Sequence, residues 1–296
     1  MAVSRKILIR VIGAPILVAA LCALLYWGHR VELSGSPNLP LTFLLILVVF
    51  TGALEFQTMC RVKGIVTAEL STRLALMLMI FIWGALPAAL IRVASPAMWT
   101  FAILTVFVLF VLCKAVFRYG SFTPEAAGMT VLGFGYLGLA LFLLIPPVTP
   151  GIRAYYLLFL LAAGKGSDMA AFVAGKSIGK HPMAPVVSPN KTWEGGIAGG
   201  IAGTGAGLAV ILLTPLREAY AGIPVAALLF FCLIVTIAGQ VGDLVKSALK
   251  RWAGVKDSGR ILPEFGGMLD MVDSFLLEGP VACLGTMALF HFFRGN

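Results

Sequence analysis

The chain has 296 residues, of which 60% are hydrophobic and only 12% are charged, and its mean hydropathy is +1.00. A soluble domain carries about a quarter charged residues and under half apolar ones, so this composition excludes a soluble globular domain, a disordered chain and a coiled coil. The net charge of +9 has no accompanying nucleic-acid fold signature, and we expect no nucleic acid as a partner. The composition predicts a polytopic membrane protein surrounded by membrane lipids.

Apolar blocks of about the length of a membrane-spanning helix follow one another along the chain. They fall near residues 7–28, 39–56, 74–92, 97–117, 129–146, 154–172, 196–214, 223–245 and 272–293. In the first block, Arg5, Lys6 and Arg10 are followed by an apolar run from about Val11 to Trp27. No clear cleavage motif comes after this run, so we expect a retained helix. The pattern predicts an all-α membrane protein with about nine transmembrane helices. Residues 1–296 are expected to form one integral membrane domain, with N-terminal spans in 7–146 and a catalytic C-terminal part in about 154–293.

The distribution of basic residues predicts the orientation of these helices. If the N-terminus is inside and the spans alternate, 17 of the 22 Lys and Arg residues lie on the inner side and five on the outer side. Cytoplasmic loops are enriched in Lys and Arg, so we expect an N-in, C-out protein of the cell (inner) membrane. Two polar stretches, 164–195 and 239–279, fall on the predicted cytoplasmic side. An active site is therefore expected to face the cytoplasm.

Two glycine patterns in the sequence predict helix packing. Gly133–Gly138 reads GxGxxG but lies inside an apolar span with no strand before it, which argues against a dinucleotide site. A ladder of small residues recurs every fourth position at Gly195, Gly199, Gly203 and Gly207. Such a ladder lets another helix approach closely. That helix could belong to the same chain or to a second copy, so the sequence is compatible with a homodimer.

The run from Gly239 to Ser274 combines carboxylates, cations and glycines at the ends of two predicted helices. Asp243, Ser247 and Lys250 share a helix face by their spacing, and Asp270 and Asp273 lie three positions apart, at i and i+3, at the start of the last helix. Mg²⁺ commonly bridges one or two carboxylates to substrate phosphates, and charge near the hydrocarbon is costly unless it has a function. The pattern favours a phosphate and metal site; the alternative is a charged loop with ordinary helix ends.

A second polar stretch contains Asp168 and the sequence from Ser188 to Gly195. Ser188-Pro189 is typical of a helix start, with serine as the cap and proline in the first turn. A helix that begins there and carries Lys191 near its N-terminus predicts an anion site. The alternative is a capped helix after a solvated loop.

These residues resemble the phosphatidate cytidylyltransferase (CDP-diacylglycerol synthase) family. The long C-terminal signature of that family is matched, with its spacing, by Ser247, Lys250, Arg251, Lys256, Asp257, Gly259, Leu262, Pro263, Gly266, Gly267, Asp270 and Asp273. The SPxKTWEG element stands at Ser188–Gly195, and the Gly-Asp-Leu at 242–244 fits as well. The resemblance covers about residues 164–274.

The resemblance implies that the chain transfers CMP from CTP to phosphatidate at the cytoplasmic membrane face. It implies metal ligands at Asp243, Asp270 and Asp273 for Mg²⁺, with a second cation such as K⁺. The implied catalytic residues are Lys250, Arg251, Lys256 and Asp257. The implied substrate-binding residues are Asp168, Ser188, Lys191, Ser247, Gly266 and Gly267.

Two positions depart from the family pattern: Phe265 replaces a histidine and Met271 replaces an arginine. Both changes put apolar side chains beside the implied metal site. Three alternatives follow: a cytidylyltransferase for another phospho-lipid, a CTP-dependent lipid kinase, or a non-catalytic relative that binds nucleotide or lipid. A transporter is the general membrane alternative, but the charged residues gather at one face rather than at mid-membrane depth.

Overall fold

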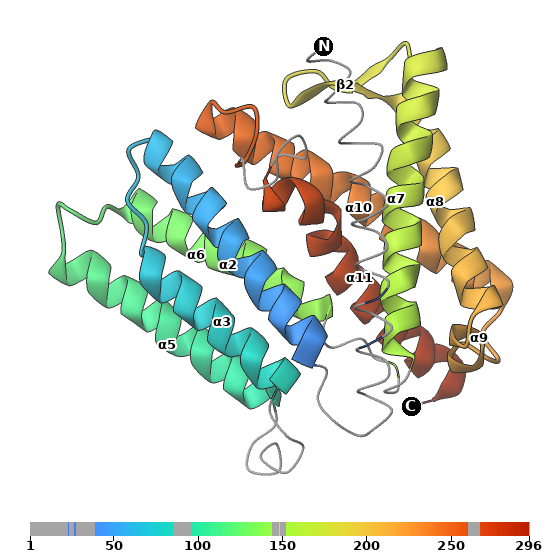
Figure 1. Cartoon of the computed structure of the whole chain (residues 1–296), viewed down its shortest axis with the longest axis horizontal. Helices are drawn as coiled ribbons and strands as arrows, with labels where there is room; N and C mark the ends of the chain where they lie inside the picture. The colour runs from blue at the N-terminus through green and yellow to red at the C-terminus, as the bar shows by residue number, and fades with distance from the viewer. Residues whose placement is uncertain are drawn as a thin grey trace. The chain divides into compact units, whose positions relative to one another are not determined.

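The computed structural model describes Ala23, Trp27, Val148 and residues 39–85, 96–143, 152–259 and 267–295. Helices make up most of this part of the chain (Figure 1). Seven of the helices described here are long and apolar enough to cross a membrane. The chain is therefore an all-α polytopic membrane protein in its main architecture, as the composition predicts.

The contacts divide the chain into two compact units, which we describe separately. The first unit contains the described residues within Met1–Leu144 and Ala253–Met271, and the second contains those within Ile145–Trp252 and Val272–Asn296. The second unit thus contains most of the predicted catalytic part, but the segment that carries Lys256, Asp257 and Asp270 belongs to the first.

The first unit is a group of packed helices that are drawn side by side in blue and green (Figure 1). Its elements are α2 (Leu39–Val62), α3 (Glu69–Ala85), α5 (Pro96–Phe117), α6 (Pro124–Gly138) and the 3₁₀-helix η1 (Leu139–Leu143). Helix α3 packs against α2, α5 and α6, and its Leu76 and Ile80 are almost completely buried. Phe107 of α5 stacks on Phe134 of α6 at 4.2 Å between ring centroids. Thr123 caps α6 ahead of Pro124 in its first turn, a pairing typical of helix starts.

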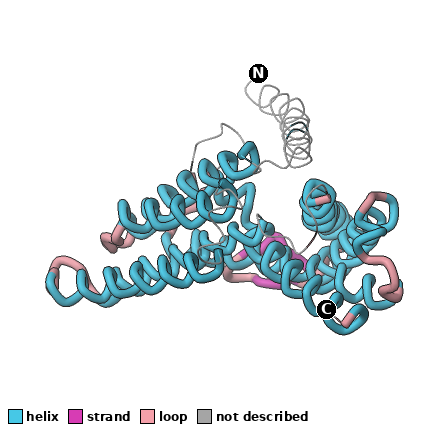
Figure 2. The backbone as a smooth tube through the Cα atoms, turned by 90° about the horizontal axis from the view of Figure 1, so that it is seen from below, coloured by secondary structure: helices cyan, strands magenta, loops and turns pink. Residues whose placement is uncertain are grey.

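The second unit consists of long helices and one small hairpin (Figure 2). Its elements are α7 (Arg153–Ile178), β1 (Pro182–Ala184), β2 (Ser188–Thr192), α8 (Trp193–Leu213), α9 (Leu216–Ala219), most of α10 (Val225–Ala253) and most of α11 (Met268–Arg294). Strands β1 and β2 pair antiparallel, with Pro182 opposite Thr192 and Ala184 opposite Ser188. The hairpin connects α7 to α8, which pack against each other.

The glycine ladder forms the contact between α7 and α8. A Cβ at Gly195, Gly199 or Gly203 would lie 2.6–2.8 Å from the backbone oxygens of Ala171, Ser167 and Ala163, respectively. A Cβ at Gly207 would lie 3.0 Å from the Phe159 ring. Because backbone atoms cannot move aside cheaply, only glycine permits this helix separation. The ladder is therefore an intramolecular packing surface.

Eight of the nine predicted apolar blocks correspond to helices in the described part of the chain, and the block at 7–28 lies almost entirely outside it. The boundaries differ by several residues. The helix predicted at 74–92 already begins at Glu69, and that predicted at 129–146 begins at Pro124. The number of spans and their orientation stay predictions.

The predicted helix start at Ser188-Pro189 is wrong. Residues Ser188–Thr192 form β2, and α8 begins at Trp193. Thr192 is the true cap, because its side-chain oxygen accepts a hydrogen bond from the Gly195 amide at 3.2 Å. Serine and threonine have similar capping preferences, and pairing with β1 keeps the residues before Thr192 extended.

Candidate active site

Four charged side chains form an ion cluster in the second unit. Lys246 Nζ lies 2.8 Å from Asp243 Oδ1 and also binds Asp273 Oδ2, while Lys191 Nζ lies 2.5 Å from Asp243 Oδ2. Lys246 and Asp273 are only 6% and 3% exposed. Since a buried charge is costly unless it is paired, the balance of two carboxylates and two ammonium groups is what makes this cluster stable.

The close approach of α10 and α11 brings the cluster together. Asp243 and Lys246 lie three residues apart on α10, and Asp273 lies in the first turns of α11. A Cβ at Gly242 would lie 2.7 Å from the backbone oxygen of Asp273, so glycine is needed where the helices meet. Asp273 is further fixed by the Ser274 amide, which donates to its Oδ1 at 2.7 Å. This explains the Gly-Asp pair at 242–243 as a packing and charge unit.

The hairpin and a glutamine hold the Lys191 side of the cluster. Lys191 lies on β2, and its Nζ also approaches the backbone oxygen of Gln240 at 3.5 Å. The Gln240 amide group donates to Ser167 Oγ on α7 and to the backbone oxygen of Gly196 on α8, both at 3.0 Å. Gln240 thus links three helices one turn before Asp243.

Other predicted residues of the second unit lie outside the ion cluster. Arg251 Nε donates to the backbone oxygen of Val187 in the hairpin turn at 3.2 Å. Ser247 and Lys250 continue along α10 and are half-buried, and Ser188 begins β2. Asp168 forms its ion pair with Lys165 at 3.2 Å, rather than with Lys191. The structure therefore brings Lys191, Asp243 and Asp273 together and leaves Asp168 separate from them.

In the first unit, Lys256 and Asp257 are exposed and line a cavity of about 380 Å³. The C-terminal end of α2 contributes Thr58, Met59 and Val62 to the wall. The cavity combines one cation and one carboxylate with apolar side chains. Gly266 and Phe265 lie outside the described residues.

Asp270 lies in the first turn of α11 and accepts hydrogen bonds from the residues around the start of the helix. Its Oδ2 accepts hydrogen bonds from the Gly267 amide at 3.3 Å and from the amide and hydroxyl of Ser258 at 3.2 and 3.0 Å. Glu55 of α2 meets the same turn: its carboxylate accepts from the amides of Met268 and Leu269 at 2.7 and 2.9 Å. The space around Gly267 is filled by Ser258 and Glu55.

Three contributors to these groups were missed by sequence reasoning. Lys246 lies one turn after Asp243, so its helical spacing could have identified it. Glu55 is a single acidic residue within an apolar span, and such a residue is costly and signals a role. No sequence signal identifies Gln240 as the link between three helices.

The acidic residues suit Mg²⁺ in their chemistry, since carboxylate oxygens are its preferred protein ligands. Asp243 and Asp273 both turn a carboxylate oxygen to one buried cation, the Lys246 ammonium. Within the described ranges, no group of three or more His, Cys, Asp or Glu side chains is placed to hold a metal ion by itself. A Mg²⁺ ion at these residues therefore fits if water and substrate phosphates supply its other ligands, as is usual for this ion.

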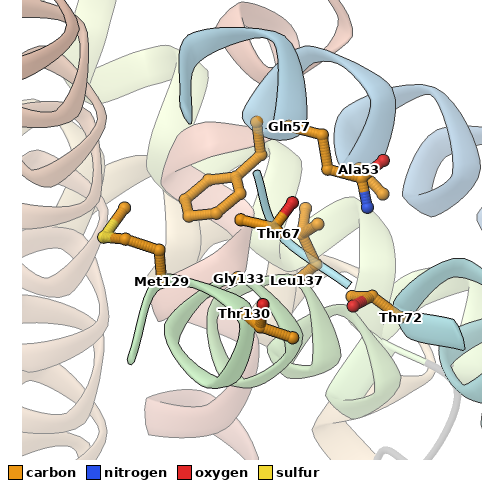
Figure 3. A pocket seen from close by; sticks show the side chains of 9 residues that line it. Ala53, Gln57, Thr67, Thr72, Met129, Thr130, Gly133 and Leu137 are labelled. Atoms are coloured by element: carbon orange, nitrogen blue, oxygen red, sulfur yellow. The ribbon is translucent and has the colours of Figure 1, made fainter. Parts of the chain in front are cut away.

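A second pocket of the first unit lies between α2, α3 and α6 (Figure 3). Gln57 and Thr67 line it, and Gln57 Oε1 and Thr67 Oγ1 are buried without a hydrogen-bond partner among the described residues. Its interior has no room for a water molecule. We therefore regard it as a packing defect rather than a substrate site.

Comparison with known proteins finds relatives that are named phosphatidate cytidylyltransferase. The chain is 37% identical to the phosphatidate cytidylyltransferase of Staphylococcus aureus (strain COL) over 174 residues, which cover 58% of this chain and 63% of the relative. It is 39% identical to that of Bacillus subtilis (strain 168) over 177 residues, 58% and 63% of the two chains. The enzyme of Brucella suis biovar 1 is 41% identical over 165 residues, 56% of each chain.

These matches thus span less than two thirds of each relative's length, whereas the match to the family as a whole is longer. Residues 8–289 match the cytidylyltransferase family, which is nearly the whole chain and includes the ion cluster, the hairpin and the start of α11. The chain therefore belongs to the cytidylyltransferase family.

Proposed function

We propose that this protein transfers CMP from CTP to phosphatidate, giving CDP-diacylglycerol and diphosphate. The observation that carries the proposal is the cluster of Lys191, Asp243, Lys246 and Asp273, in which Lys246 and Asp273 are buried. Such a cluster offers both cations for phosphate oxygens and carboxylates for a divalent ion. Three of its residues, Lys191, Asp243 and Asp273, lie in segments that match the family pattern, and the relatives named phosphatidate cytidylyltransferase support the same activity.

In the proposed reaction, an oxygen of the lipid phosphate attacks the α-phosphorus of CTP. A new P–O bond forms, the bond between the α-phosphorus and the oxygen bridging to the β-phosphate breaks, and diphosphate leaves with that oxygen. The nucleophile is already ionised, so no general base is needed. The protein contributes positioning and charge stabilisation, as in phosphoryl transfer generally.

Each group of charged residues then has a part in binding. Lys191, Lys250 and Arg251 hold the triphosphate, with Ser188 and Ser247 alongside them on the same elements. Lys256 and Asp257 line the cavity near the end of α2, and we assign the lipid phosphate to it. Asp168, next to Lys165, completes the nucleotide side.

Asp243 and Asp273, with Asp270 as the third carboxylate of the family pattern, would hold Mg²⁺. When bound there, the ion would supply positive charge against the charge that develops on the transferred phosphate. A second cation such as K⁺ is part of the same proposal. Gly266 and Gly267 belong to it as points of close backbone approach, next to Asp270 in the sequence.

We further propose nine spans with the N-terminus inside, the C-terminus outside and the active site at the cytoplasmic face of the cell membrane. The 17-to-five split of basic residues supports this orientation. Reporter fusions test it: one at Asn296 should read extracytoplasmic and one in the hairpin turn at Val187 should read cytoplasmic. A cytoplasmic C-terminus would contradict the nine-span arrangement.

The activity is tested with the purified full chain in vesicles that contain phosphatidate. With Mg²⁺ and CTP labelled at the α-phosphate, the label should enter the lipid and diphosphate should appear in equal amount. The vesicles without phosphatidate are the control. If no labelled lipid forms while a known relative is active in the same vesicles, the proposal is wrong.

A second candidate rests on Met271, which stands where the family pattern has an arginine. A missing cation beside the metal residues favours a different phospho-lipid acceptor, or a CTP-dependent lipid kinase. CTP labelled at the γ-phosphate separates these activities. A kinase transfers that label to the lipid and releases CDP, whereas a cytidylyltransferase releases the label as diphosphate.

A further inference from the structure

The first turn of α11 has an unusual source of hydrogen-bond acceptors. The first amides of any helix lack partners within the helix and must be satisfied from outside it. In α11 the Gly267 amide donates to Asp270, and the amides of Met268 and Leu269 donate to Glu55. The Asp270 amide donates to the Gly267 oxygen at 3.1 Å. All four amides are therefore satisfied, two of them by a residue more than 200 positions earlier in the chain.

Glu55 is buried at this contact, and the residues around it leave space for its carboxylate. Its side chain lies on α2 and is only 5% exposed. A Cβ at Gly259 would lie 2.5 Å from Glu55 Oε1, and the space at Gly267 is bounded by the same carboxylate. Glycines at both positions thus leave room for Glu55. Negative charge at a helix N-terminus is also favoured by the helix dipole.

Ser258 connects Glu55 to Asp270. Its hydroxyl lies 2.9 Å from Glu55 Oε2 and 3.0 Å from Asp270 Oδ2. The hydroxyl has one hydrogen, so it donates to one carboxylate at a time, and the Ser258 amide holds Asp270 independently. The two carboxylates therefore share the Ser258 hydroxyl as a donor, and moving one changes the hydrogen bonding of the other.

We propose that Glu55 is a positioning residue for cytidylyl transfer. By binding the first amides of α11 and Ser258, it fixes the Asp270 carboxylate in the orientation that its role requires. This inference rests on the proposed function, and it gives the N-terminal helices a part in a reaction whose signature lies in the C-terminal half.

The test uses the full chain in vesicles and the variants Glu55→Gln and Ser258→Ala. Glu55→Gln keeps the size of the side chain but leaves one acceptor oxygen for three donors. Glu69→Gln is the matched control, because Glu69 is also a carboxylate of the first unit but pairs with Arg61 and Arg73. Two properties are measured: hydrogen exchange of the peptide 267–275 without Mg²⁺ or substrate, and kcat, KM for CTP and Mg²⁺ requirement.

We expect Glu55→Gln and Ser258→Ala to speed exchange at the start of α11 while Glu69→Gln does not. We also expect kcat to fall at least about tenfold, or half-maximal activity to require at least about tenfold more Mg²⁺, as for residues that orient metal ligands. KM for CTP should change less than about twofold, and the double variant should lose less than the sum of the single variants, because the two residues share partners.

Normal exchange in Glu55→Gln would overturn the proposal, because Glu55 would then not hold the helix start. Faster exchange with unchanged kcat and Mg²⁺ requirement would also overturn it, because the role would be structural only. A parent chain without transferase activity would overturn the proposed function and the catalytic part of this inference. The exchange measurement needs no substrate, so it would still show whether Glu55 holds α11.

Discussion

Lys246 on α10 and Asp273 on α11 form an ion pair in which both side chains are buried. The same ammonium also binds Asp243 at 2.8 Å, so one cation contacts two carboxylates, while Lys191 contacts Asp243 from the other side. Removing one partner of a buried pair leaves an uncompensated charge, which typically costs about 3–5 kcal/mol. The stability of this region therefore depends on Lys246 more than on any exposed ion pair.

We expect Lys246→Met to lower the midpoint of thermal unfolding by on the order of 10 °C. Mg²⁺ should recover part of this loss, since the ion would neutralise the carboxylate charge that Lys246 no longer pairs; Asp243 keeps its contact with Lys191. Thermal unfolding of the purified protein, with and without Mg²⁺, measures both effects. Lys165→Met is the control: the Lys165–Asp168 pair is over 40% exposed on both sides, and such pairs contribute about 0–1 kcal/mol. Equal midpoints for the two variants would contradict the prediction.

Replacing Asp270 or Asp273 by Asn should lower activity at least about 100-fold if each ligates an essential cation. The change keeps the shape of the side chain and removes its charge. Turnover over a range of Mg²⁺ concentrations measures the effect, and Glu69→Gln is again the control for loss of a carboxylate. Near-normal, Mg²⁺-dependent turnover in both Asn variants would place the metal elsewhere.

The glycine ladder gives a prediction with a control on the same helix. Gly203→Ala would place a Cβ 2.6 Å from the backbone oxygen of Ala163, so α7 and α8 must separate and the unfolding midpoint should fall. Gly205→Ala meets no atom within 4 Å and should leave stability unchanged or raise it by up to about 1 kcal/mol, since alanine favours helix. A Gly203→Ala protein as stable as Gly205→Ala would contradict the packing role.

The helices themselves were largely predictable from the sequence, because each apolar block has the length of a membrane span and few charges. The hairpin was not, since Ser188-Pro189 fits a helix cap as well as a strand, and only pairing with 182–184 decides between them. The contact between Lys246 and Asp243 could have been predicted, because the two residues lie three positions apart on one helix. The contact of Glu55 with Met268 joins residues 213 positions apart, and no local pattern contains that information.

Glu278 is the most unusual buried acid in the described part of the chain. It is fully buried on α11 between Gly164 and Gly239, and neither carboxylate oxygen has a hydrogen-bond partner among the described residues. Because an unpaired buried charge is costly, we expect Glu278→Gln, which has the same size and no charge, to unfold at an equal or higher temperature. A loss of more than about 10 °C would contradict this and would mean that the carboxylate has an essential partner.

The last prediction concerns the two departures from the family pattern. Met271 follows Asp270 in the first turn of α11 and is half-buried, while Phe265 lies outside the described residues. A hydrogen bond from a charged group contributes about 1.5–3 kcal/mol. If the arginine bond forms only in the transition state, its absence slows the reaction roughly 10- to 150-fold. We therefore expect the parent chain to use phosphatidate slowly or to prefer another phospho-lipid.

The test is the double change Phe265→His with Met271→Arg, assayed beside the parent and each single change on phosphatidate. Turnover should rise in the double variant, and Met271→Arg alone should give most of the gain, because arginine supplies the charge. A pH step in the rate that is present only with Phe265→His would trace to the imidazole, since phenylalanine cannot titrate. If the parent already matches an intact relative and neither change alters turnover, both departures are neutral and the choice of phospho-lipid must be set by other residues, such as those lining the cavity at Lys256.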